Sequence, residues 1–222
     1  MATATTSRPI VYTGATLHNV EWATYCKLRD EEANNHVRMI YLDGELTVVS
    51  PHIAHDLNSR IFLFVIAAVA RASRVEFLPV GTTTLKKRGR GPSKGVGKEP
   101  DEGVYLRENV ARMHNKKVLD LKLDPPPDLA LEIDNKVNSE KAMITYARIG
   151  VPEVWRFDIE DETLWFGCLG GGRYRELERS LGFPRLTPAL FLQSLEAYRE
   201  GLSFNDWLDW LDAWARNLPE PN

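Results

Sequence analysis

The stretch DLALEID, residues 128–134, gives the strongest indication of the fold in this chain of 222 residues. Side chains alternate between the two faces of a β-strand, so one face of this segment would carry the acids Glu132 and Asp134. The opposite face would be apolar and would carry Leu129, Leu131 and Ile133. Three prolines at 125–127 keep the preceding residues out of a helix. We therefore predict a central strand with carboxylates on one face.

A hairpin and a long helix are predicted upstream of this strand. Residues 37–42 and 45–49 have the composition of strands, and Asp43-Gly44 between them is a strong signal for a two-residue turn. Beyond Pro51, apolar residues recur at spacings of three and four, at Ile53, Leu57, Ile61, Phe64, Val65 and Ala68. The second half of this helix is apolar nearly all round, so we expect it deep in the core.

The other predicted elements complete an α/β fold with a central mixed sheet flanked by helices. Further strands are expected at 75–80, 82–85, 101–106, 119–123 and 154–157, with a hairpin of 163–168 and 173–178. Helices are expected at 20–33, from Asn138 or Ser139 to Ile149, and from about Pro188 and about Ser203. We predict one domain over residues 1–222, with a tail at 1–16, an N-terminal hairpin, a core at roughly 37–158, and a C-terminal hairpin and helices at 163–217.

The overall composition is typical of a globular protein, with 43% hydrophobic and 27% charged residues and a mean hydropathy of −0.32. No segment is apolar for long enough to predict a membrane span, and the N-terminus has no pattern of a secretory signal. Cys26 and Cys168 are far apart and outside any CxxC pattern, so we expect a reducing cytoplasm. The 28 basic and 31 acidic residues give a formal net charge of −3, which argues against coating DNA by charge alone.

Asp101, at the predicted start of one strand, and Glu132, late in another, are candidates for a metal site. Mg²⁺ and Mn²⁺ prefer oxygen ligands, and carboxylates that converge without a cation raise one another's pKa values. A bound cation removes this repulsion, so we prefer a metal site to an accidental acidic face. The structural alternative is that Pro-Asp is common in turns and that a lone glutamate on a strand usually faces solvent.

Four segments together resemble a known family. They are YLDGELTVVSP at 41–51, EPDEGVYL at 99–106, PPPDLALEID at 125–134 and YARIGVPEVWRFD at 146–158. In this order and spacing the chain resembles the Uma-type family of restriction endonuclease-like proteins, within the PD-(D/E)XK nuclease superfamily. The resemblance implies a restriction endonuclease-like core that binds Mg²⁺ or Mn²⁺ and cleaves DNA.

The resemblance also implies functions for individual residues. Asp101 and Glu132 would bind the metal and act in catalysis, with the main-chain carbonyl of Ile133 as a further ligand. Glu45 and His55, from the DGEL segment and the helix after it, resemble additional site residues of the family. Asp134 shares a strand face with Glu132 and joins the candidate metal ligands.

The sequence departs from the superfamily at one position. The superfamily pattern has lysine two residues after the glutamate, where this chain has Asp134. The resemblance implies that the following helix supplies the cation, so Lys141, or less favourably Lys136, is the predicted catalytic lysine.

A basic, glycine-rich loop precedes Asp101. It contains Lys86, Lys87, Arg88, Arg90, Lys94 and Lys98 and has no acidic residue until Glu99. Its alternative interpretation is a solvated hairpin tip. Because the chain is acidic overall, we predict that this concentration of positive charge contacts DNA.

Near the C-terminus, an aromatic stripe recurs at helical spacing, at Phe204, Trp207, Leu208, Leu211 and Trp214. Packing on the protein's own sheet is the first interpretation, and a homodimer interface is the second.

The sequence thus predicts a Mg²⁺-dependent endonuclease that hydrolyses phosphodiester bonds of DNA. The competing hypothesis is a catalytically degenerate nuclease-fold protein that binds nucleic acid or a partner without cleavage. A third is a structural or oligomerising protein built on the C-terminal helix.

Overall fold

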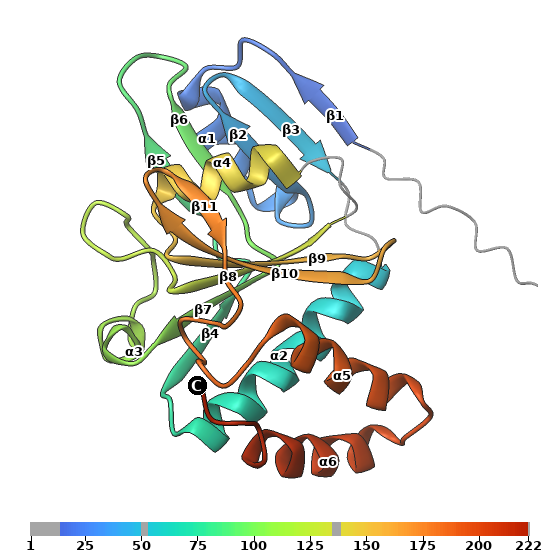
Figure 1. Cartoon of the computed structure of the whole chain (residues 1–222). Helices are drawn as coiled ribbons and strands as arrows, with labels where there is room; N and C mark the ends of the chain where they lie inside the picture. Colours follow the sequence, from blue (N-terminus) through green and yellow to red (C-terminus); the bar gives the residue numbers. More distant parts are fainter. Residues whose placement is uncertain (1–13, 50–52, 135–138, 222) are drawn as a thin grey trace, which may run out of the picture.

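A six-stranded mixed sheet forms the centre of the fold in the computed structural model, which describes residues 14–49, 53–134 and 139–221 (Figure 1). Its strand order is β11-β10-β9-β8-β7-β4, in which only β8 and β9 are parallel neighbours. The strands are β4 (Phe77–Gly81), β7 (Glu102–Leu106), β8 (Leu129–Asp134), β9 (Glu153–Asp158), β10 (Thr163–Gly170) and β11 (Arg173–Glu176). This sheet and its flanking helices confirm the predicted mixed α/β class.

A second, antiparallel sheet of five strands has the order β1-β3-β2-β6-β5. The strands are β1 (Gly14–Leu17), β2 (Arg38–Leu42), β3 (Glu45–Val49), β5 (Leu85–Arg88) and β6 (Gly95–Lys98). The turn between β2 and β3 has positive φ at both Asp43 (46°) and Gly44 (96°). Positive φ at both central residues is what a type I′ hairpin requires, so the predicted hairpin is confirmed.

Helices cover both sheets. The longest described helix is α2 (Ile53–Ser73), which packs on one face of the six-stranded sheet together with α5 (Pro188–Arg199), and α6 (Phe204–Arg216) packs against α2 and α5. Between the two sheets lies α4 (Ser139–Ile149), and α1 (Trp22–Asp30) covers the other face of the five-stranded sheet. A single 3₁₀ turn, η1 (Glu32–Asn34), follows α1, and the short α3 (Glu108–Met113) follows β7.

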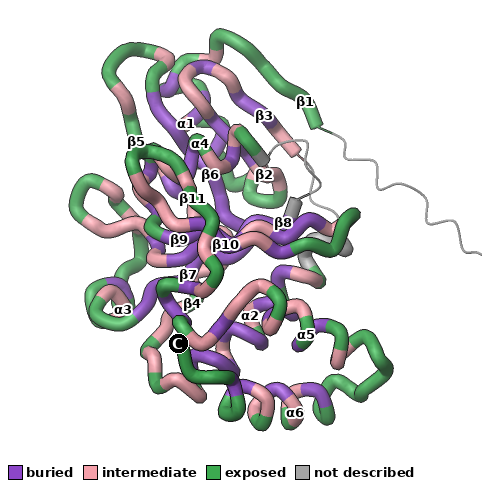
Figure 2. Tube along the Cα trace, viewed as in Figure 1, coloured by how far each residue is buried: buried purple, intermediate pink, exposed green. Residues whose placement is uncertain are grey.

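Aromatic rings fill the core between α2, α5 and the six-stranded sheet. Phe62 contacts Phe157 and Phe191 with ring centroids 4.9 and 4.7 Å apart, and Trp155 stacks on Phe166 at 4.3 Å. Figure 2 shows the buried residues concentrated along the central strands and the inner side of α2. The predicted deep position is confirmed for most of the second half of α2, whereas Leu57 and Phe64 of the predicted stripe are 59% and 40% exposed.

The aromatic stripe of α6 packs within the chain. Trp207 is fully buried, and its Nε1 donates to the Ser194 carbonyl at 2.9 Å. Its ring also contacts Tyr198 and Phe64, at centroid distances of 4.9 and 6.5 Å. The stripe therefore faces α2 and α5 rather than the sheet itself, and the homodimer interface stays a prediction. Among the described helices, none combines the length and apolar character that crossing a membrane requires.

Several predicted boundaries were wrong. The tail predicted at 1–16 is wrong for residues 14–16, which belong to β1 and pair with β3; residues 1–13 lie outside the described part. The strand predicted at 82–85 instead begins at Leu85 and runs to Arg88 as β5, which pairs with β6, so that much of the predicted basic loop is a hairpin. The helix expected at 20–33 is shorter, and the irregular stretch after 106 contains α3.

The strand expected at 119–123 is a series of turns. Asp120 Oδ1 accepts from the Lys122 amide at 3.0 Å, and Asp124 Oδ2 accepts from the Asp120 amide at 3.1 Å. Aspartate side chains that bind nearby amides compete with strand pairing. The alternating leucines were nevertheless informative, because Leu119 and Leu121 pack against the buried cluster around α4.

Candidate functional site

The start of β7 and the end of β8 bring Asp101 and Glu132 together. The Asp101 amide donates to the Leu131 carbonyl at 3.1 Å, and Asp101 Oδ2 accepts from the Ile133 amide at 2.7 Å. Glu132 therefore lies between the two residues whose backbone binds Asp101. From α2, Ser59 Oγ donates to the Asp101 carbonyl at 3.0 Å and anchors the same turn. Asp101 and Glu132 are each only 6% exposed, so the site is built into the interior.

Glu132 has a lysine and a tyrosine as partners. Lys98 Nζ, at the end of β6, lies 2.7 Å from Glu132 Oε1, and both side chains are less than one-tenth exposed. The Tyr146 hydroxyl, from α4, donates to Glu132 Oε2 at 2.7 Å. The Lys98 ammonium also lies 5.5 Å from the centre of the Tyr146 ring. Residues from β6, β8 and α4 thus meet at this carboxylate.

The carboxylates of Glu132 and Asp101 both influence these partners. Burial by itself would lower the pKa of Lys98, but Glu132 and then Asp101 raise it, and the net pKa lies above its usual value. The pKa of Tyr146 is raised well above its ordinary range by burial, and further by the same two carboxylates. At neutral pH the cluster therefore contains an ammonium and a neutral phenol beside two acids.

Strand alternation in β6 explains why Lys98 points into this cluster. Gly95 and Gly97 lie under the rings of Trp22 and Tyr25 from α1, where a Cβ would overlap the aromatic atoms. Val96 and Lys98 point to the opposite face, towards α4. The glycines therefore let α1 approach one face of β6 closely, while Lys98 points from the other face towards Glu132.

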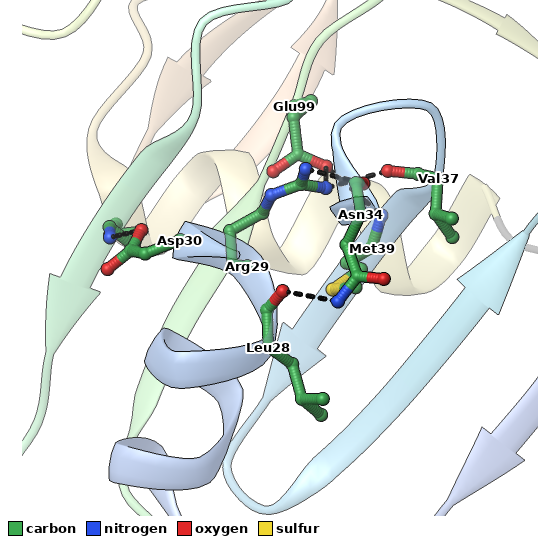
Figure 3. A network of polar contacts seen from close by, with 8 residues as sticks. Leu28, Arg29, Asp30, Asn34, Val37, Met39 and Glu99 are labelled. Atoms are coloured by element: carbon green, nitrogen blue, oxygen red, sulfur yellow. Dashed lines mark hydrogen bonds and ion pairs between the residues drawn. The ribbon is translucent and has the colours of Figure 1, made fainter. Parts of the chain in front are cut away.

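Glu99 anchors the same segment on the α1 side (Figure 3). Its Oε2 accepts from the Met39 amide at 3.0 Å and lies 3.5 Å from Arg29 Nη1. Arg29 also donates to the carbonyls of Val37 and Asn34, at 2.6 and 2.8 Å. Glu99 thus ties the backbone between β6 and β7 to both β2 and α1.

A second polar cluster lies on the α4-facing side of the five-stranded sheet. Lys141 Nζ forms an ion pair with Glu45 and donates to Thr47 Oγ1 at 2.8 Å. The hydrogen bond from Lys141 lowers the pKa of Glu45. Thr47 is paired with Ile40 and Ile40 with Lys98, so the two clusters lie in one row across β3, β2 and β6. Two predicted residues, Glu45 and Lys141, thus come together beside the first cluster.

Other predicted site residues lie elsewhere or outside the description. The side chains of His55 and Asp134, and the whole of Lys136, lie outside the described residues. Within the described ranges, no group of three or more histidine, cysteine or acidic residues is arranged to hold a metal ion. Ile133 is buried directly beside Glu132. The roles of all these residues as metal ligands stay predictions.

The basic loop is partly neutralised by other residues. Lys86 pairs with Asp30 at 2.5 Å and Lys94 with Asp43 at 3.5 Å. Lys87 Nζ donates to the Arg148 carbonyl at 2.8 Å, near the end of α4. Lys98 is buried in the cluster with Glu132 and is not part of the exposed loop. The remaining two arginines, Arg88 and Arg90, are exposed and form no ion pair with any described residue.

The sequence interpretation missed Lys98 and Tyr146 as parts of the site. Lys98 was grouped with the exposed basic loop, although the GVGKEPD pattern carried a signal: small residues alternate with Val96 and Lys98. Tyr146 opens the fourth family-like segment but had been assigned no role.

Comparisons with known proteins agree on a nuclease-like fold. A family model described as "Uma2: Putative restriction endonuclease" matches residues 22–203. A solved structure from Anabaena variabilis, described as "a putative nuclease belonging to DUF820", is similar with a TM-score of 0.50 and 17% sequence identity, over 86% of this chain and 99% of that chain. No curated protein sequence matches the chain.

Proposed function

Because the chain belongs to the Uma2 family, whose description is "Putative restriction endonuclease", we propose that it is a Mg²⁺-dependent endonuclease that hydrolyses phosphodiester bonds of DNA. Family membership supports a nuclease function, and the proposal adds the metal and the substrate. The observation that carries it is the buried convergence of Asp101 and Glu132 with the Lys98 ammonium.

The donor set suits a divalent cation. Asp101, Glu132 and the Ile133 carbonyl offer hard oxygen ligands, which Mg²⁺ and Mn²⁺ prefer. When bound, such an ion would polarise a phosphoryl oxygen and lower the pKa of a water molecule. Asp101 is preorganised for this role, since one carboxylate oxygen is held by the Ile133 amide at 2.7 Å.

Lys98 would take the role of the lysine that the superfamily pattern has two residues after the glutamate, where this chain has Asp134. Its ammonium is held at 2.7 Å from Glu132 Oε1. From this place it can stabilise the negative charge that develops on the phosphate and orient the attacking water. The Tyr146 hydroxyl fixes the other oxygen of Glu132. Lys141, the lysine predicted from the sequence, would instead support the neighbouring cluster through Glu45.

Cleavage of supercoiled plasmid in MgCl₂ tests the proposal. Asp101→Asn and Glu132→Gln should each reduce nicking by at least roughly a hundredfold, because each replaces a negatively charged metal ligand at the reacting centre with a neutral amide. Asp43→Asn is a matched control, since Asp43 pairs with Arg148 and Lys94 on the surface. If both site variants cleave as fast as this control, the assignment of the site is wrong.

The degenerate alternative is favoured by one feature, Asp134 in the position of the motif lysine. Calorimetric titration of the folded chain with MgCl₂ and MnCl₂ separates the two functions. Binding of the cation that is lost in Asp101→Asn supports the enzyme. DNA binding without cation binding or cleavage supports the alternative.

A further inference from the structure

The strand register places an arginine directly beside Glu132. Glu132 on β8 pairs with Arg156 on β9, and Arg156 pairs with Trp165 on β10. Residues paired across neighbouring strands point to the same face of a sheet. Arg156 and Trp165 therefore extend the α4-facing side of the sheet outward from Glu132, across three strands that lie side by side (Figure 1).

The side chain of Arg156 is directed along the sheet towards Trp165. Its guanidinium carbon lies 5.8 Å from the centre of the indole ring, within the range of a cation–π contact. The indole in turn lies over Gly167, where a Cβ would overlap the ring. The absence of a side chain at Gly167 thus lets Trp165 lie flat along β10 and support the guanidinium from below.

The hydrogen-bonding groups of Arg156 are unused within the described part of the chain. Arg156 is half-buried, yet no carboxylate or carbonyl among the described residues pairs with it, and Glu132 is bound by Lys98 and Tyr146 instead. Arginine presents five N–H donors in a planar fork that fits a phosphate with two parallel hydrogen bonds. Stacking already restricts this half-buried arginine, so its side chain loses little additional conformational entropy when it binds such an anion.

We propose that Arg156 binds a backbone phosphate of the nucleic acid strand adjacent to the scissile phosphate, and that Trp165 positions it. The identity of the ligand as nucleic acid rests on the proposed function, whereas phosphate binding by Arg156 does not require cleavage. Arg156 is the contact residue, and Trp165 and Gly167 act through it.

The test measures DNA binding in the Asp101→Asn background, so that cleavage does not intervene. A fluorescein-labelled duplex is titrated by anisotropy at several salt concentrations. Arg156→Gln should weaken binding about tenfold, the effect of losing hydrogen bonds to a charged group. It should also reduce the slope of log K against log[salt] by about one, as expected for one lost phosphate contact.

Three variants distinguish contact from positioning. Arg156→Lys keeps the charge and the salt slope but should recover only part of the affinity, because an ammonium cannot form the paired hydrogen bonds. Trp165→Leu should weaken binding with the salt slope unchanged, since the charge remains. Arg173→Gln, at an exposed arginine of β11, is the matched control and should leave affinity near the parent value.

The outcomes separate this inference from the proposed function. If the parent protein cleaves DNA but Arg156→Gln and Arg173→Gln have the same DNA affinity and the same salt slope, only the role of Arg156 is overturned. Arg156-dependent DNA binding without cleavage by the parent protein would overturn the nuclease function and leave the inference standing. A chain that binds no DNA at all would overturn both.

Discussion

Replacing Lys98 with methionine should destabilise the protein substantially. Lys98 and Glu132 are 6% and 9% exposed at their side chains, and their charged atoms lie 2.7 Å apart. Removing one partner of a buried ion pair leaves the other charge without compensation and costs roughly 3–5 kcal/mol. For a domain of this size, each kcal/mol lowers Tm by about 2–4 °C, so we expect a decrease of about 6–20 °C.

Urea unfolding at pH 7, followed by circular dichroism, measures the effect. The double variant Lys98→Met, Glu132→Gln should recover part of the loss, because the neutral amide no longer needs the ammonium. Lys86→Met is the matched control. Lys86 pairs with Asp30 at the surface, with side chains 29% and 61% exposed, and loss of such a pair costs about 0–1 kcal/mol.

Addition of MgCl₂ links this measurement to the proposed site. If the cation binds the same carboxylates, it should offset part of the destabilisation in Lys98→Met, because it compensates the charge of Glu132 and stabilises only the folded state. The reasoning is refuted if Lys98→Met costs less than about 1 kcal/mol, the value typical of an exposed pair, and the cost is the same with glutamate or glutamine at position 132.

Two further predictions concern the surface and the pH dependence. Replacing Arg88 and Arg90 together with glutamine should weaken DNA binding and lower the salt slope by about two. Lys86 is already paired with Asp30, so Lys86→Gln should change the affinity and the slope less. Equal effects of the two changes in anisotropy titrations would contradict the assignment of the two arginines. Burial raises the pKa of Glu153 above its usual value of 4.5, so the folded state binds the proton more tightly and stability should increase as the pH falls through the raised pKa towards 4.5. Glu153→Gln should make the free energy of unfolding depend less on pH in that window, and an unchanged dependence in urea titrations would show that the carboxyl is not responsible.

The sequence alone determined the parts of this fold that follow from short-range patterns. The alternation in DLALEID identified β8 and the acidic face that carries Glu132. Asp43-Gly44 identified a turn, because only residues that tolerate positive φ allow a tight hairpin there. The order of the family-like segments was enough to predict that Asp101 would lie beside Glu132. These features are local, or they repeat a known order of elements.

The tertiary structure decided which lysine meets Glu132 and which arginine stands beside it. Lys98 and Lys141 are both near a predicted strand or helix end, and the alternation around Lys98 indicates which strand face its side chain takes but not that Glu132 lies on that side. Lys98 meets Glu132 because Gly95 and Gly97 occupy the face of β6 that packs against α1, which leaves the side chain of Lys98 on the opposite face. Lys141, on α4, forms an ion pair with Glu45 on β3 instead. The position of Arg156 depends on the parallel register of β8 and β9. Such pairings join segments far apart in the chain, and they are set by how the sheets and helices pack rather than by any local propensity.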